Sequence, residues 1–331
     1  MIKDFSMRGI WNDAALRPDR EAKKRDYLWA SMLSRPLVDN YLSMMGVEPS
    51  NPPNMRSRRK FLAGNLIEEI QGIIVNCLGL KTDKQEEVWT RGVIDVKGKL
   101  DFLIQGKPDY FGARKKINKL GFSKETIDYL LSVVDKFEIT IGNNEFAPMI
   151  RECKSCSQYV IEKIGKGGEI IGHKLQLYHY LKGMNLPLGY VDYISKDNML
   201  MEECLVEYPD KRLEDIYNNY LTDLKKYLDA NERPPLESLI AWEGKFSKNF
   251  GIEYSGYLTM LYGFETPEAY REVVSGKIAR WNRVLLRVKN NDKMTKKNEE
   301  VIKEMEISGY NVQELAGKLE GVIEEEVEIK E

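Results

Sequence analysis

The sequence has few of the residues that several common kinds of site require. It contains only 2 His among 331 residues, which excludes a His-rich metal site and disfavours a Ser-His-Asp triad. Four Cys are too few for a disulfide framework in a chain of this length, so we expect reduced thiols. No run of 18 apolar residues occurs, and no transmembrane helix is expected. The opening residues MIKDF lack the apolar core of a signal peptide, which favours a cytoplasmic location.

An excess of charge of one sign is also missing. The chain has 50 Lys and Arg against 52 Asp and Glu, a net charge of −2, which at first disfavours a polyanion partner. Residues 296–331 hold 11 acidic and 5 basic residues, a net charge of −6. Residues 1–295 therefore carry +4, the difference between −2 and −6. We interpret the acidic end as a solvated tail, with partner binding or self-masking as the alternative.

What the sequence does contain is apolar residues in spacings that predict an α/β or α+β fold. Hydrophobic residues make up 42% of the chain, enough for a sizeable core. A helix, three strands, a helix and two strands lie in order between helical flanks, which indicates a central mixed sheet covered by helices. Helices are expected over 20–46 with a restart at Pro36, and over 56–78, 124–137, 172–183 and beyond 209. Strands are expected over 88–96, 100–104, 148–155, 188–194 and 199–207, with a turn at Lys97-Gly98.

The same pass suggests four regions. They are an N-terminal helical region (1–60), a core (61–208) with an insertion at about 106–146, a helical C-terminal region (209–292) and an acidic tail (293–331). The helix over 56–78 is expected to place Phe61, Leu62, Leu66, Ile70, Ile73 and Ile74 on its apolar side.

Charged residues stand in segments that should form buried strands. Glu152 and Lys154 lie in the strand around residue 150 and point to the same side, because alternate strand residues share a face. Asp101 precedes the apolar strand 102–104. Buried charges are costly unless they are paired or bind a metal ion. A functional site and a buried ion pair are therefore the two readings of these residues.

Two helices carry further polar candidates. Glu68 and Glu69 lie on the helix before the strands, and the apolar pattern leaves open which of them faces inward. Gln176 and Tyr180 are four residues apart on the helix over 172–183 and share a face. His173 lies near that face.

These residues fall in the order Gly64-x-x-x-Glu68, Gly98-x-x-Asp101, Glu152-x-Lys154 and Gln176-x-x-x-Tyr180. In this order the chain resembles the PD-(D/E)XK nuclease superfamily, and within it the RecB-like and phage exonuclease branch, which is related to the Cas4 group. The resemblance covers roughly residues 60–208. It implies a restriction-endonuclease-like core and a Mg²⁺- or Mn²⁺-dependent cut of a phosphodiester bond.

The resemblance also implies roles for the residues. Glu68, Asp101, Glu152 and the backbone carbonyl of Cys153 would hold the metal ion, a donor set that suits Mg²⁺. Lys154 would hold or help deprotonate the attacking water and stabilise the anionic transition state. Gln176 and Tyr180 would orient that water or a phosphate oxygen. DNA would be contacted by His173 and by the basic cluster Arg56, Arg58, Arg59 and Lys60, for which a solvated helix start is the alternative reading.

Some alternatives stay open. Asp95 also fits a Gly-x-x-Asp pattern through Gly92, although Asp101 is preferred because a continuous apolar strand follows it. Cys77, Cys153, Cys156 and Cys204 lack the C-terminal trio of the Cas4 group, so an iron–sulfur cluster is not expected. Trp89, Tyr110, Phe111 and Trp242 are candidates for stacking on bases.

The expected function is a DNA exonuclease in recombination, repair or phage DNA metabolism, acting in the cytoplasm of a bacterial or phage-infected cell on single- or double-stranded ends. A structure- or site-specific endonuclease and a non-catalytic DNA-binding or scaffold protein are the alternatives. Partners left open are a single-strand-binding or recombination protein and a second copy of the chain, and no membrane is expected.

Overall fold

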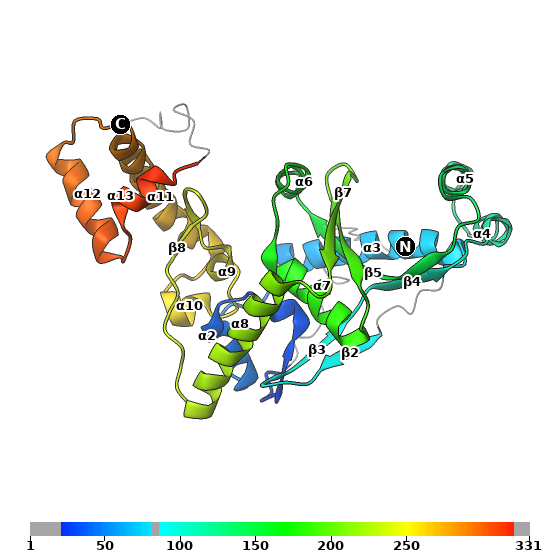
Figure 1. Cartoon of the computed structure of the whole chain (residues 1–331), viewed down its shortest axis with the longest axis horizontal. Coiled ribbons are helices and arrows are strands. Elements are labelled where there is room, and N and C mark those ends of the chain that lie inside the picture. The colour runs from blue at the N-terminus through cyan, green and yellow to red at the C-terminus, as the bar shows by residue number, and fades with distance from the viewer. Residues whose placement is uncertain (1–20, 81–85, 321–331) are drawn as a thin grey trace, which may run out of the picture. The chain divides into compact units, whose positions relative to one another are not determined.

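The computed structural model describes residues 21–80 and 86–320 (Figure 1). These residues form two compact units, and each is described here by itself. The first unit contains residues 21–47 and 53–233, and the second contains residues 48–52 and 234–320. This division differs from the boundary near residue 208 that the sequence suggested, because the helix α8 (Lys211–Ala230) packs on α2 (Leu37–Met44) and α7 (Ile171–Met184) of the first unit.

The first unit contains two sheets. The larger has the order β4-β5-β6-β7, with β5 (Phe146–Cys156) parallel to β6 (Leu188–Ser195), and with β4 (Phe102–Gly106) and β7 (Met201–Glu207) antiparallel at its edges. The smaller has the order β1-β3-β2, formed by Tyr27–Trp29, Asp95–Lys99 and Glu87–Thr90. The expected class, a central mixed sheet flanked by helices, is confirmed.

Helices cover both faces of the larger sheet (Figure 1). On one face lies α3 (Met55–Cys77), where Gly72 meets the ring of Phe102 and the side chain of Gln71 donates a hydrogen bond to Asp192 on β6. On the other face lies α7, where Leu177 packs against Gly189. Because β5 runs between the two helices, its alternate residues enter two different environments.

The remaining helices of the first unit enclose these layers. The helices α4 (Tyr110–Ile117) and α5 (Lys124–Ile141) occupy the expected insertion, and their buried residues join the apolar cluster formed with α3 and β4. The helix α5 begins as expected at Ser123, whose side chain accepts the backbone N–H of Thr126. The helix α6 (Gln158–Gly165) follows β5 and packs on β6 and β7.

Two local expectations are wrong. The first part of the segment expected to be helical over 20–46 forms β1 and a short 3₁₀ turn (Ala30–Met32). The helix α2 starts at Leu37, where a restart was expected. The strand expected over 88–96 is broken at residues 91–94, and Lys97 and Gly98 lie within β3 rather than in a turn. Backbone pairing explains both, because β3 pairs with β1 on one side and with β2 on the other.

The helix α3 matches the expected span and, in part, the expected apolar face, since Ile73 and Ile74 pack against the core. Asn54 caps its start by accepting the N–H of Ser57 at 2.9 Å. Phe61, Leu66 and Ile70 are exposed, whereas Ile67 and Val75 are buried. The contacts of this helix with the sheet therefore follow small and polar positions such as Gly64, Gln71 and Gly72.

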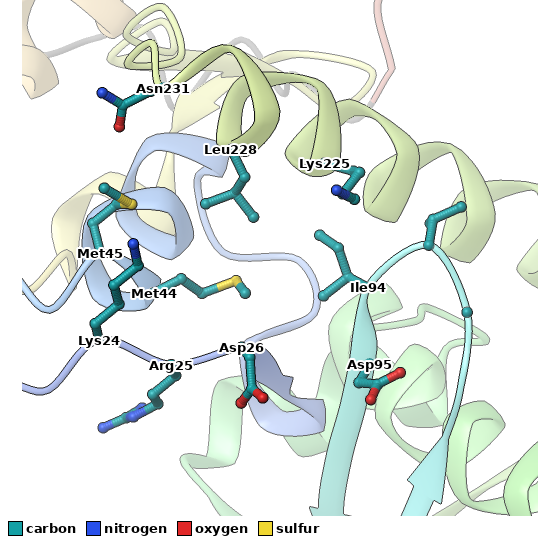
Figure 2. A pocket seen from close by; sticks show the side chains of 12 residues that line it. Lys24, Arg25, Asp26, Met44, Met45, Ile94, Asp95, Lys225, Leu228 and Asn231 are labelled. Carbon is teal, nitrogen blue, oxygen red and sulfur yellow. The ribbon is translucent and has the colours of Figure 1, made fainter.

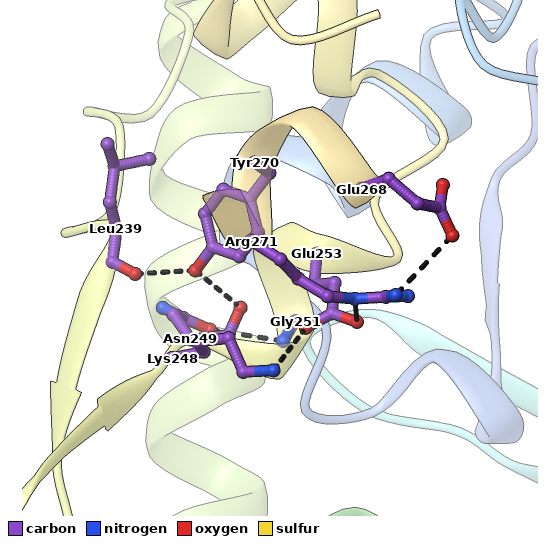
Figure 3. Close-up of polar contacts among 8 residues, drawn as sticks. All are labelled: Leu239, Lys248, Asn249, Gly251, Glu253, Glu268, Tyr270 and Arg271. Carbon is purple, nitrogen blue, oxygen red and sulfur yellow. Dashed lines mark hydrogen bonds and ion pairs between the residues drawn. The ribbon is translucent and has the colours of Figure 1, made fainter. Parts of the chain in front are cut away.

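The second unit is helical with one β-hairpin, although a wholly helical region was expected. The hairpin pairs β8 (Ile240–Trp242) with β9 (Phe246–Lys248). The helix α11 (Pro267–Lys289) supplies Trp281 and Leu285 to the core. The carboxylate of Glu253 is buried and pairs with Arg271 at 2.7 Å (Figure 3). The other helices are α9 (Phe250–Glu253), α10 (Leu258–Tyr262), α12 (Lys296–Ile307) and α13 (Val312–Gly317).

The region expected to be a solvated tail contains packed structure. Val301 and Met305 of α12, with Val312 and Ala316 of α13, are buried in the same core as Trp281. Residues 321–331, which hold the acidic end of the tail, lie outside the described residues. Within the described ranges, no helix is both long enough and apolar enough to span a membrane.

Candidate active site

The acidic residues Asp101 and Glu152 face each other where β4 begins beside β5. Phe102 pairs with Arg151 in the antiparallel register, so the position before it, Asp101, lies opposite Glu152 on the α7 side of the sheet. The carboxylate of Asp101 accepts the backbone N–H of Cys153 at 2.8 Å. Glu152 is almost wholly buried. Two segments about 50 residues apart therefore place two carboxylates at one point.

The other motif residues form a hydrogen-bonded chain to Glu152. Lys154 Nζ donates to Glu152 Oε1 at 2.6 Å, and Gln176 Nε2 donates to the same oxygen at 2.7 Å. Gln176 Nε2 also donates to the hydroxyl of Tyr180 at 2.9 Å, and this hydroxyl donates to the carbonyl of Lys99 at 3.0 Å. The spacing of four residues on α7 places Gln176 and Tyr180 on one face, as the sequence predicted.

Gly98 makes this arrangement possible. A Cβ added at Gly98 would lie 2.3 Å from Cε1 of Tyr180 and 2.9 Å from its hydroxyl oxygen. Any side chain at this position would therefore displace Tyr180. Close packing of β3 against α7 therefore explains the glycine of the Gly98-x-x-Asp101 motif.

Glu68 lies on α3 and acts on the site through its charge. Its side chain is half-buried, whereas Glu69 is exposed, so Glu68 is the better placed of the two. The carboxylate of Glu68 contributes to raising the pKa of both Asp101 and Glu152. Gly64, one turn before it, brings α3 against β5, since a Cβ there would lie 2.8 Å from Oγ of Ser155.

Burial dominates the electrostatics of this cluster. It raises the pKa of Asp101 well above its usual range, and the charges of Glu152 and Glu68 raise it further. Burial also raises the pKa of Glu152, while Lys154 opposes that rise. For Lys154 burial disfavours the charge, but Glu152 and Asp101 outweigh it and raise its pKa. Lys154 is thus held as a cation between two carboxyl groups.

The donor chemistry at this point suits a hard divalent cation. The second oxygen of Glu152, Oε2, is buried and has no hydrogen-bond partner within the structure, and an uncompensated buried carboxylate oxygen is costly. In residues 21–80 and 86–320, no group of three or more His, Cys, Asp or Glu side chains is arranged to hold a metal ion. Two carboxylates and a backbone carbonyl nevertheless suffice for Mg²⁺, which commonly binds one or two carboxylates, water and substrate phosphate.

The remaining candidates lie in different places. His173 is half-buried on α7, where Nδ1 lies 3.2 Å from the hydroxyl of Tyr193. Burial, with a smaller contribution from Lys154, lowers its pKa to about 3, so His173 is neutral. A neutral histidine brings no positive charge to a DNA phosphate, and the DNA contact expected of His173 stays a prediction.

The basic cluster at the start of α3 is only partly a free surface. Arg59 and Lys60 are exposed, whereas Arg58 Nε donates to the carbonyl of Pro53 at 2.9 Å. The side chain of Arg56 is outside the described parts of the chain. Lys196 lies in the turn after β6, and its pKa is lowered by burial and by the charge of Lys60. This turn therefore adds positive charge near the cluster.

Asp95, the alternative to Asp101, lies at the opposite end of β3. It pairs with Arg91 and lines a pocket of about 690 Å³ together with Lys24, Ile94 and Leu228 (Figure 2). Five residues, Val96 through Leu100, separate it along the chain from Asp101. Among the described residues, no hydrogen bond links it to Glu152 or Lys154. The structure thus places Asp101, not Asp95, beside Glu152.

One network next to the site was missed by sequence reasoning. On the α3 side of β5, Arg151 donates to both oxygens of the buried Asp192, at 2.9 and 2.7 Å, and Gln71 donates to the same carboxylate. Arg151 is next to Glu152 on β5, and its ion pair with Asp192 joins β5 to β6. The available signal was Asp192 inside the apolar strand GYVDYI, since a charge there requires a partner.

The aromatic stacking candidates are mostly occupied. Tyr110 is buried and donates from its hydroxyl to the carbonyl of Gly142 at 2.7 Å. Trp89 is half-buried, with Lys97 Nζ and the guanidinium carbon of Arg91 each 4.8 Å from its ring centroid. Trp242 packs in the second unit. Phe111, with 81% of its surface exposed, is the one of the four candidates that remains open.

No known family model matches the chain, and no curated protein matches it. Among solved structures, the crystal structure of SSO0001 is similar over 70% of this chain and 90% of that one, at 14% identity and a TM-score of 0.40. An alkaline exonuclease from Laribacter hongkongensis, LHK-Exo, is similar over 67% of this chain and 95% of that one, at 10% identity and a TM-score of 0.33. Both TM-scores lie below 0.5, so a functional assignment depends on the residues of this chain.

Proposed function

We propose that the protein is a metal-dependent deoxyribonuclease that hydrolyses phosphodiester bonds and degrades DNA from its ends. The observation that carries this proposal is the meeting of Asp101, Glu152, Lys154, Gln176 and Tyr180. They come from three separate segments and are joined by hydrogen bonds and charge at one point of the sheet. An ion pair needed only for stability would not require the further polar partners or leave one carboxylate oxygen unpaired.

Asp101, Glu152 and the carbonyl of Cys153 would hold Mg²⁺ or Mn²⁺, with Glu68 close enough to add negative charge. When bound, the ion would activate water and neutralise charge on the phosphate. Gln176 and Lys154 hold Glu152 Oε1 and leave Oε2 for this purpose. Tyr180, tied to the carbonyl of Lys99, fixes Gln176.

Lys154 supplies a fixed positive charge. Its raised pKa keeps it protonated at neutral pH, so it stabilises the negative charge that develops on the phosphate rather than acting as a base. A charge held in place by its hydrogen bond to Glu152 requires little reorganisation during the reaction. Removing such a group typically costs about 10²- to 10³-fold in rate.

The test is to incubate purified protein with end-labelled linear single- and double-stranded DNA and with a closed circle, in Mg²⁺, Mn²⁺ or EDTA. Degradation of linear DNA that spares the circle supports the proposal, whereas cutting of the circle supports an endonuclease. The variants Glu152→Gln and Lys154→Met should lose cleavage, and the control Glu207→Gln, an exposed glutamate on β7, should keep it. Binding of DNA without any cleavage in either metal would favour a non-catalytic DNA-binding protein.

The biological setting, DNA recombination, repair or phage DNA metabolism, belongs to this proposal through the sequence resemblance alone. The polarity seen with 5′- and 3′-labelled substrates would show which end the enzyme requires.

A further inference from the structure

Charge is strongly segregated within the second unit. Residues 277–297 contain eight basic residues and a single acidic one, Asp292, while the rest of residues 234–320 contain five basic and twelve acidic residues. The unit is therefore close to neutral as a whole but has one segment with a net charge of +7. This segment is the C-terminal half of α11 and the loop after it.

The arginines of this segment share one side of α11. Arg280, Arg283 and Arg287 are separated by three and four residues, which at 3.6 residues per turn places them within a sector of about 60°. The buried residues Trp281 and Leu285 lie to another side and pack in the core of the unit. The arginines therefore form a row along the helix, here called the basic face of α11.

Several other cations of the unit are paired within it. Lys277 contacts Glu304 at 2.9 Å, Arg271 contacts Glu253 at 2.7 Å (Figure 3), and Lys318 contacts Glu314. By contrast, within the described ranges no ion pair joins Arg280 or Arg287 to an acidic side chain.

The basic surface continues beyond the helix. Arg280 is exposed, as are Lys293, Lys296 and Lys297 in the loop after α11 and the first turn of α12. The hydrogen bond from Lys277 is the main cause of the lowered pKa of Glu304, and the charge of Arg280 contributes less. Arg283 and Arg287 are half-buried, so the exposed positive charge of this surface comes mainly from Arg280 and the three lysines.

We propose that the basic face of α11, together with Lys293, Lys296 and Lys297, binds the phosphate backbone of DNA as a second contact separate from the candidate active site. A row of guanidinium groups with nearby lysines matches the repeating negative charge of a nucleic-acid strand. Binding at this surface depends on the charge of the phosphates and not on the base sequence of the DNA. It rests on the proposed function only in taking DNA as the polyanion.

The test is the salt dependence of binding by the full-length protein. Fluorescence anisotropy with a labelled duplex is measured in EDTA, where no metal-dependent cleavage takes place. Each phosphate contact contributes about −0.9 to the slope of log Kobs against log salt. The double variant Arg280→Gln/Arg287→Gln should therefore have a slope less negative by about 1.8. The ratio of parent to variant affinity should be about twelvefold larger at 50 mM than at 200 mM salt.

The matched control is Lys303→Gln/Lys318→Gln, which removes the same charge from α12 and α13 of the same unit and should leave the slope near that of the parent. The variant Arg280→Lys/Arg287→Lys should also retain the slope. Should the glutamine variant fail to fold, as judged by circular dichroism, Lys293→Gln/Lys297→Gln in exposed positions serves instead.

Parent-like slopes in folded Arg280→Gln/Arg287→Gln and in Lys293→Gln/Lys297→Gln would overturn the proposal. So would an equal change in the Lys303/Lys318 control, because the effect would then follow net charge alone. The outcome is separable from the proposed function, since Glu152→Gln should lose cleavage and keep the parent slope, whereas Arg280→Gln/Arg287→Gln should keep turnover at saturating DNA and raise KM.

Discussion

Replacing Gly98 with alanine tests whether close packing of β3 against α7 sets the geometry of the site. The added Cβ would lie 2.3 Å from Cε1 of Tyr180, where ordinary contacts are 3.4–4 Å. The Tyr180 ring must therefore shift by about 1 Å or more, which is typical of overpacking that costs about 1–3 kcal/mol. The shift would also weaken the hydrogen bonds of Tyr180 to the carbonyl of Lys99 and to Gln176, each worth about 1 kcal/mol.

Gly98→Ala should thus lower the free energy of unfolding by about 2–4 kcal/mol and reduce cleavage of linear DNA. Urea denaturation followed by circular dichroism measures the first effect. Gly121→Ala is the control, because a Cβ at Gly121 meets no atom within 4 Å. A double-mutant cycle with Tyr180→Ala identifies the cause. The reasoning is refuted if Gly98→Ala destabilises the protein equally when the Tyr180 ring is absent.

Three further predictions concern charge. Arg151→Leu leaves the buried carboxylate of Asp192 without its main partner, so the free energy of unfolding should fall by about 3–5 kcal/mol. Adding Asp192→Leu should recover most of this loss, because no buried charge is then left unpaired. A double variant that urea denaturation finds no more stable than Arg151→Leu would contradict this. Burial lowers the pKa of His179 to about 4 in the folded protein. As the pH falls below about 6.5, the imidazole of His179 therefore binds a proton in the unfolded chain before it does so in the folded one. Stability is lost between about pH 6.5 and pH 4. His179→Gln should remove about 2 kcal/mol of the stability change between pH 7 and pH 5, and an unchanged pH dependence of unfolding would disprove the assignment. Deleting residues 321–331 removes five acidic and one basic residue and leaves the packed helices α12 and α13 in place. DNA binding measured by anisotropy should therefore tighten at low salt and not at high salt. If the truncated protein and the parent bind DNA equally well at low salt, the tail is merely solvated.

The candidate site was predictable because its motifs are local. Glu152 and Lys154 share a face through the period of two in a strand, and Gln176 and Tyr180 through the turn of a helix. Each segment could therefore be read without knowledge of its neighbours. The pairing of Asp101 with Glu152 followed from both being charged within apolar strands, and the register of β4 with β5 places them together.

The features that could not be predicted depend on distant partners. Tyr27 and Leu28 fit a helical spacing, yet they form β1 because β3 pairs with them from residues 95 and 96. Gly98 looked like a turn residue, but it is a strand residue made necessary by Tyr180, 82 positions later. Phe61, Leu66 and Ile70 follow the period of a buried helix and are exposed, because small residues of α3 face the sheet instead.

The central claim is that Lys154 and the paired carboxylates Asp101 and Glu152 form a catalytic centre and not a structural ion-pair cluster. The most direct measurement is the initial rate of Mg²⁺-dependent degradation of linear duplex DNA by the parent and by Lys154→Met, with folding of both checked by circular dichroism. A catalytic centre predicts a loss of at least about 10²-fold in the folded variant and no activity of the parent in EDTA. Full activity in folded Lys154→Met, or cleavage that EDTA leaves unchanged, would contradict the account.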